Sequence, residues 1–194
     1  MIYMDQIYNP CPCGSGMKFK FCCLKKKPEE LLKDSVKFPL FECLLANNGW
    51  QRHGMSVLYI CRQMAECRYI CAFYMVDTYC LGLKNTFVNV NQEKQQMLDI
   101  RGRLAQNGAL QPYNYEEARS LILGAIDYAA SFGFQPNEDW QLSRYVVEDE
   151  RPYVPRFKFG KDGKPFYIQG PHDDTTAIVK KLARSDHHFL TRAN

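Results

Sequence analysis

The chain has 194 residues, of which 46% are hydrophobic and 24% charged, and this composition is typical of a folded globular protein. The longest apolar run, residues 69–76, is far shorter than the ~20 residues that a membrane-spanning helix needs. Met1–Tyr8 lacks the basic and apolar regions of a secretory signal, so the sequence predicts a cytoplasmic protein without a membrane span. The formal net charge of +4 is too small by itself to predict nucleic-acid binding.

The nine cysteines fall into two groups, one clustered within residues 11–23 and one scattered among apolar residues. A cytoplasmic protein keeps its thiols reduced, so a disulfide framework is not expected. The clustered group has the spacing C-x-C-x8-C-C, which supplies the four sulfur ligands that tetrahedral structural zinc requires. We therefore expect one structural Zn²⁺ per chain, bound by Cys11, Cys13, Cys22 and Cys23.

The residues between the two cysteine pairs suit a small metal module. Gly14 and Gly16 permit a positive φ in the turn after the first pair, and Ser15 can support that turn. Phe19 and Phe21 are expected to provide the apolar cover that so short a segment otherwise lacks. Because four thiolates leave no open coordination position, a catalytic zinc is not expected.

Lysines crowd around the same segment, and no acidic residue occurs between Asp5 and Glu29. One interpretation is that their positive charge stabilises the thiolates. The other is that they form a surface for an acidic partner, either a protein or the ribosome and its RNA. The candidate partner-binding residues are Lys18, Lys20, Lys25, Lys26 and Lys27.

The segment Asn9-Pro-Cys-Pro-Cys-Gly-Ser-Gly-Met-Lys-Phe-Lys-Phe-Cys-Cys23 resembles the SEC-C motif. That motif is named for the zinc tail of the bacterial preprotein translocase ATPase, which contacts the chaperone SecB and the ribosome. This resemblance covers only about residues 9–24, and Met17 stands where the family usually has Lys or Arg. It implies zinc binding here and does not carry over the translocase role.

Pro28 closes the cysteine-rich segment, which predicts a zinc module at residues 1–27 and an α+β domain at residues 28–194. In the first half of that domain the patterns predict helices from Pro28 and over Leu40–Ala46. Two runs rich in β-branched and aromatic residues, Met55–Arg62 and Arg68–Tyr79, predict an antiparallel hairpin, although the second run also suits a buried helix.

The second half predicts three helices and another hairpin. The clearest helix is Tyr115–Phe132, with a capping residue at Asn114 and Gly133 after its end. The other expected elements are a helix over Glu93–Leu104 and a hairpin that joins Arg156–Phe159 to Phe166–Gln169. A final helix is expected from Asp173 or Asp174. It should bury Ile178, Val179 and Leu182 and expose Lys180, Lys181 and Arg184.

Several residues of the larger domain have both a functional and a structural interpretation. Asp77 lies in an apolar stretch, where it is either a perturbed acid or base or, more simply, an ion-paired or outward-facing residue with Lys84 nearby. His172, Asp173 and Asp174 suggest a site of hard metal ligands, but an aspartate before Thr175 more often caps a helix.

The scattered cysteines have the same two interpretations. Cys67, Cys71 and Cys80 suggest a second thiolate site, but their apolar neighbours favour buried structural thiols. A nucleophile at Cys80 would need a histidine partner, and the candidates are His53, His172, His187 and His188. Nothing in their spacing supports that pairing.

Segments 76–85 and 159–174 resemble uncharacterised bacterial proteins that contain the SEC-C motif, a likeness that implies no activity. The sequence favours a zinc-binding adaptor that docks on an acidic protein or on RNA through its basic module. The alternative is an enzyme of hydrolase-like activity, with a site around Asp77 and Asp173 and a purely structural zinc. A third interpretation is a zinc that only stabilises the N-terminal segment.

Overall fold

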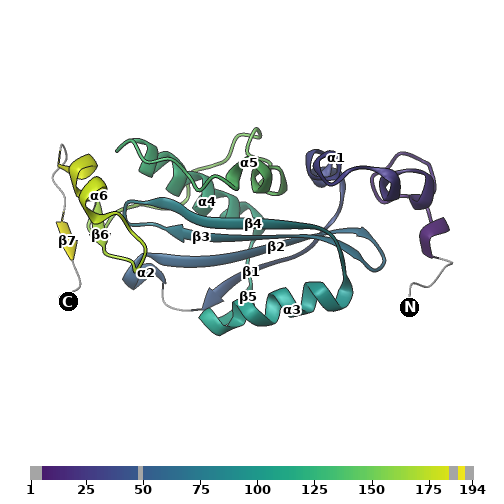
Figure 1. Cartoon of the computed structure of the whole chain (residues 1–194), viewed down its shortest axis with the longest axis horizontal. Helices are drawn as coiled ribbons and strands as arrows, with labels where there is room; N and C mark the ends of the chain where they lie inside the picture. Colours follow the sequence, from purple (N-terminus) through teal and green to yellow (C-terminus); the bar gives the residue numbers. More distant parts are fainter. Residues whose placement is uncertain (1–5, 48–49, 184–187, 191–194) are drawn as a thin grey trace.

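A computed structural model describes residues 6–47, 50–183 and 188–190. Its centre is a five-stranded antiparallel sheet with helices on both faces (Figure 1), which confirms the predicted α+β class. The strand order is β4-β3-β2-β1-β5. The strands are β1 (Leu40–Asn47), β2 (Met55–Ala65), β3 (Arg68–Asp77), β4 (Gly82–Glu93) and β5 (Ala109–Pro112).

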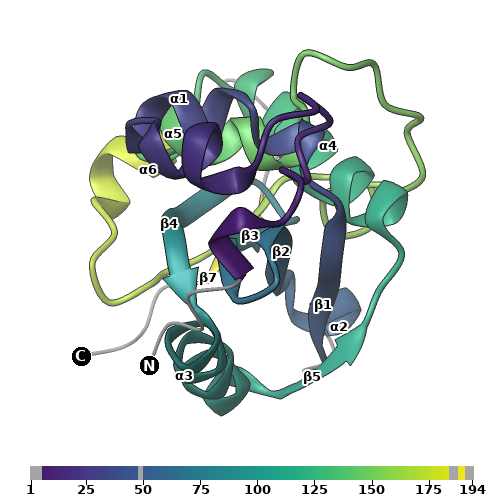
Figure 2. The same cartoon turned by 90° about the vertical axis from the view of Figure 1, so that its right-hand side faces the viewer.

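Two layers of helices cover the sheet. Helices α1, α4 and α5 lie on one side, and α3 lies on the other (Figure 2). The α-helices are α1 (Pro28–Lys33), α2 (Trp50–His53), α3 (Lys94–Leu104), α4 (Tyr115–Ala130), α5 (Trp140–Ser143) and α6 (Thr175–Leu182). Three 3₁₀ turns belong to the N-terminal segment: η1 (Gln6–Tyr8), η2 (Phe19–Phe21) and η3 (Cys23–Lys25). Three others belong to the sheet domain: η4 (Ser35–Lys37), η5 (Ala105–Asn107) and η6 (Arg144–Val147).

Alternation along the strands produces two hydrophobic clusters. In β2, Leu58 and Ile60 face the α4 layer, whereas Tyr59 and Cys61 face α3. Because both faces are covered, residues 57–61 form a continuous apolar run. The antiparallel pairing of β2 with β3 confirms the predicted hairpin. None of the helices in the described ranges is long and apolar enough to cross a membrane.

The strongest helix prediction is confirmed. The Asn114 side chain accepts a hydrogen bond from Glu117 N at 3.1 Å at the start of α4, and Gly133 follows with φ of 80°. Helix α6 begins as expected, because Asp174 accepts from Ala177 N at 3.0 Å, and Leu182 is buried. Arg184 lies outside the described residues.

The predicted helix over Leu40–Ala46 is wrong, because this segment is strand β1. It lies between β2 and β5, with Cys43 and Leu45 toward one layer of helices and Leu44 and Ala46 toward the other. A short run that is apolar on both faces shows neither the period of a helix nor that of a strand. The sequence alone therefore could not distinguish a helix from a strand here.

The predicted hairpin between Arg156–Phe159 and Phe166–Gln169 is also wrong, although the turn expected within it is present. Lys161 pairs with Lys164 around Asp162 and Gly163, which have φ of 56° and 79°. Arg156–Phe159 forms no strand; instead β6 (Phe166–Ile168) pairs in parallel with β7 (His188–Leu190). The partner is distant in sequence, and local turn signals carry no information about it.

Candidate metal centre

The first cysteine pair is held in a tight loop that closes on itself. Cys11 N donates to Met17 O at 2.7 Å, and Phe19 N donates to Asn9 O at 2.9 Å. Gly14 and Gly16 adopt φ of 78° and 74°, in the left-handed region that the sequence predicts for them. The loop thereby carries its two sulfurs back toward the second pair.

The second pair lies at the junction of two 3₁₀ turns. Cys22 follows η2, where its N–H donates to Phe19 O at 3.1 Å, and Cys23 begins η3. All four Sγ atoms lie within 4.8 Å of one another. Sequence spacing and backbone therefore bring Cys11, Cys13, Cys22 and Cys23 together at one point.

The spacing of the sulfurs fits a tetrahedral metal ion. Cys13 Sγ lies 3.6 Å from Cys22 Sγ, and Cys22 Sγ lies 3.8 Å from Cys23 Sγ. Zn–S bonds of about 2.3 Å in a regular tetrahedron place sulfurs about 3.8 Å apart. The site thus has the ligand type, ligand number and spacing that a structural zinc ion needs.

The thiols differ in how readily they ionise. Burial raises the pKa of Cys23 and Cys11. At Cys13, burial opposes ionisation, but the hydrogen bonds of Ser15 and the Cys11 thiol outweigh it and lower the pKa to about 6. Ser15 also acts in the turn, as predicted, because its Oγ accepts from Met17 N at 3.3 Å and lies 3.2 Å from Cys22 Sγ.

Lys26 differs from the other candidate lysines of the segment because it forms an ion pair with a carboxylate of the fold. Its ammonium forms an ion pair with Asp34, which also binds Lys37 at 2.6 Å. The hydrogen bond to Asp34 raises the pKa of Lys26, and the negative charge of ionised Cys23 and Cys22 adds to this effect. The charge-stabilising interpretation therefore fits Lys26, whereas Lys18, Lys25 and Lys27 are exposed.

The cysteine cluster is continuous with the core of the sheet domain. Cys11, Cys22 and Cys23 belong to the same hydrophobic cluster as Leu31 of α1 and Ile60 of β2. Phe19 is buried in this cluster, as predicted. The prediction that Phe21 also covers the module is wrong, because 53% of its surface is exposed.

Asp77 has a structural role in the fold. It is buried at the end of β3, where its Oδ1 accepts hydrogen bonds from Tyr79 N at 2.8 Å and Cys80 N at 2.9 Å. Burial raises the pKa of Asp77, and these backbone donors act against that shift. Lys84 is not its partner, since the Lys84 ammonium binds Asp173 at 2.8 Å.

We expect Asp77→Ala to destabilise the protein by about 1–3 kcal/mol, because two buried N–H groups lose their acceptor. Asp77→Asn keeps an acceptor oxygen, so it should cost much less. Urea unfolding of the two variants measures the difference. Equal losses would contradict a capping role.

Within the part of the chain that the structure describes, the remaining candidates do not converge on a second site. Asp174 caps α6, and Asp173 accepts from Lys84, Gly170 N and Tyr167 Oη, so the capping interpretation holds for Asp174. His172 is exposed at the same turn.

Cys71 and Cys80 are buried thiols, as their apolar neighbours predict, whereas Cys67 is only partly buried. Cys71 faces Cys61 across β2 and β3 with sulfurs 3.7 Å apart, Cys67 lies in the turn between these strands, and Cys80 lies in a separate cluster. Burial raises the pKa of Cys80, which argues against a nucleophilic thiolate. The side chains of His187 and His188 lie outside the described residues.

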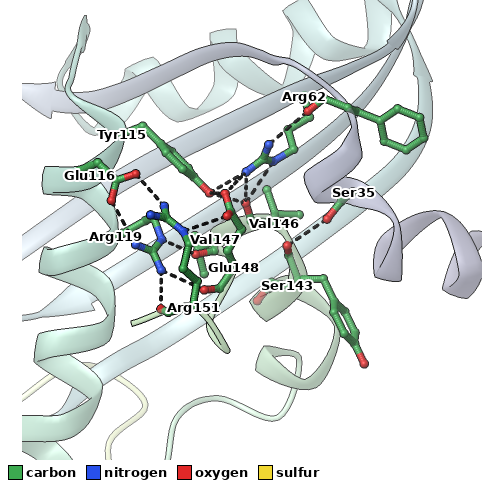
Figure 3. A network of polar contacts seen from close by, with 12 residues as sticks. Ser35, Arg62, Tyr115, Glu116, Arg119, Ser143, Val146, Val147, Glu148 and Arg151 are labelled. Carbon is green, nitrogen blue, oxygen red and sulfur yellow. Dashed lines mark hydrogen bonds and ion pairs between the residues drawn. The ribbon is translucent and has the colours of Figure 1, made fainter. Parts of the chain in front are cut away.

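Two buried arginines that the sequence analysis missed bind the chain segment at residues 146–151 and hold it against α4 and β2 (Figure 3). Arg119 of α4 donates to the carbonyls of Val147, Glu148 and Arg151 at 2.8, 2.9 and 2.7 Å. Arg62 of β2 binds the Glu148 carboxylate at 2.9 Å. No local pattern marks these residues, because the carbonyls that Arg119 binds and the carboxylate that Arg62 binds all lie 28 or more positions along the chain.

Comparison with known proteins identifies one segment. Residues 9–25 match the family model of the SEC-C motif. No curated protein and no solved structure matches the chain. The chain therefore carries a SEC-C motif whose four cysteines are gathered at one point and which is followed by an antiparallel sheet domain.

Proposed function

We propose that this protein binds one structural zinc ion through Cys11, Cys13, Cys22 and Cys23, and uses the basic surface around that ion to contact an acidic partner. The observation that carries the proposal is the set of four sulfurs within 4.8 Å of one another. Four thiolates complete the coordination of zinc, so the ion supplies stability and charge and no reaction is assigned to it.

The basic surface is held in place by the metal ligands themselves. Lys20 and Lys25 lie in the short turns η2 and η3 that position Cys22 and Cys23. Turns of this length have no independent stability, so zinc binding would order both the ligands and the lysines. We therefore regard residues 1–27 as an interaction module attached to the domain at residues 28–194.

Charge reversal should separate the structural lysine from the partner-binding ones. We expect Lys18→Glu, Lys25→Glu and Lys27→Glu together to reduce partner recovery from lysate at least about tenfold, and wild-type binding to weaken steeply as salt rises. Lys26 is left unchanged because it pairs with Asp34.

The matched control reverses Lys94 and Arg103, which are exposed on α3. It should retain partner recovery and zinc content. Unchanged recovery by the triple variant would overturn the interaction function, whereas normal zinc content in that variant shows that the metal centre is intact.

A further inference from the structure

An exposed aromatic pair stands on the outer side of the zinc module. Tyr8 of η1 and Phe21 of η2 pack edge to face with ring centroids 6.5 Å apart. Their exposed fractions are 42% and 53%. Neither ring covers the hydrophobic core, so their contribution to the stability of the fold is small and their rings are available to a partner.

Lysines surround both rings. The Lys20 ammonium donates a hydrogen bond to Tyr8 Oη at 2.6 Å and lies 4.6 Å from the centre of that ring. The Lys18 ammonium lies 5.7 Å from the Tyr8 ring, and that of Lys25 lies 5.5 Å from the Phe21 ring. Residues 6–28 contain no carboxylate, so no carboxylate within the segment pairs with these three cations.

A surface that alternates aromatic faces with cations fits a ligand that alternates flat bases with phosphates. Unpaired bases stack on aromatic rings, and the phosphates between them bind lysines. Bases in a duplex are already stacked on one another, so a duplex offers the rings no equivalent contact. An acidic protein would use the cations but would leave the exposed rings without a specific role.

We propose that Tyr8 and Phe21 bind single-stranded RNA, with bases stacked on the rings and phosphates on Lys18, Lys20 and Lys25. This inference rests on the proposed function, because the zinc ligands position η2 and η3. The lysines that now lie over the rings would turn to the phosphates, and an incoming base would take their place.

The test compares two substitutions at Phe21 in the full zinc-loaded chain, using fluorescence anisotropy of a fluorescein-labelled 15-nucleotide oligouridylate. Phe21→Leu keeps an apolar side chain but removes the aromatic face, so the Kd should rise about tenfold. Phe21→Trp enlarges the aromatic face and should preserve or tighten binding. Because Phe21 is exposed, both variants should keep the wild-type melting temperature.

Salt dependence tests the lysines independently. Substitution of Lys25 by Gln should reduce the slope of log K against log salt by about 0.7, the value for one phosphate contact on a single strand. Val154→Ala is the matched control, because Val154 is 68% exposed and lies outside the module. It should bind the oligonucleotide like the wild type.

Three results would overturn the inference: no binding of the oligouridylate, equal binding by the Leu and Trp variants, or equally tight binding of a 15-base-pair RNA duplex. Failure here is distinguishable from failure of the proposed function. If the charge-reversal variant loses its lysate partner while Phe21→Leu retains it, the basic surface binds an acidic protein and the RNA assignment falls alone.

Discussion

Removal of zinc should destabilise the sheet domain as well as the N-terminal module. Cys22 and Cys23 are buried in the same hydrophobic cluster as Leu31, Leu32 and Phe38, so loss of the metal should disturb that core. Structural zinc binds small modules with apparent free energies of roughly 10–16 kcal/mol, comparable with the ~5–15 kcal/mol stability of a whole domain.

The measurement combines elemental analysis with thermal unfolding, before and after chelation. We expect one zinc per chain, and a melting temperature that falls by more than about 10 °C when the metal is removed, since each kcal/mol shifts it by roughly 2–4 °C at this chain length. The double variant Cys22→Ser, Cys23→Ser should reproduce the loss without a chelator.

Cys67→Ser provides the matched control for thiol removal, because Cys67 lies in the turn between β2 and β3 and outside the cluster. It should retain full zinc content. If the melting temperature does not change when the zinc is removed, the ion stabilises the N-terminal module alone. The shared hydrophobic cluster would then not couple zinc binding to the stability of the sheet domain.

Substitution of Arg119 by Met should cost about 3–5 kcal/mol of stability. The Arg119 side chain is fully buried, and its guanidinium binds three backbone carbonyls as well as Glu116 at 3.1 Å. Methionine fills much of the same volume but donates no hydrogen bond, so the carbonyls of Val147, Glu148 and Arg151 would be left without their donor.

The geometry of the donor matters as much as its charge in this network. A lysine at position 119 keeps the charge, but its ammonium lacks the planar set of N–H donors with which the guanidinium binds three carbonyls. Arg119→Lys should therefore lose most of the same stability. Arg103→Met, exposed on α3, should change stability by less than about 0.5 kcal/mol. Denaturant unfolding that places Arg119→Met close to Arg103→Met would contradict the structural role of the network.

The cysteine cluster was predictable because its information is local. All four cysteines lie within residues 11–23, and the glycines that permit the turn lie between them. The Arg62 and Arg119 network was not predictable, because Arg62 is separated by 86 positions from Glu148 and its importance depends on the packing of β2 against η6. A buried arginine cannot be told from an exposed one until its partners are known.

The same distinction explains the errors in the fold. Helix α4 has a complete apolar stripe and a cap at Asn114, so its pattern identifies it. Strand β1 packs on both faces only over residues 43–46, which is too short a run to show a period, so its pattern is ambiguous. Strand β4, which the sequence analysis did not predict, ends in polar residues such as Asn89 and Gln92 and is defined by its pairing with β3.

The path of the chain between β4 and β5 has a consequence for the order of folding. Strands β1, β2, β3 and β4 follow one another as neighbours, whereas β5 joins the sheet at the free edge of β1 only after α3 has crossed beneath the sheet. Contacts between neighbouring segments require little loop closure and form early. The four-stranded meander of β1 to β4 should therefore form first, and the addition of β5 to the β1 edge should follow the docking of α3.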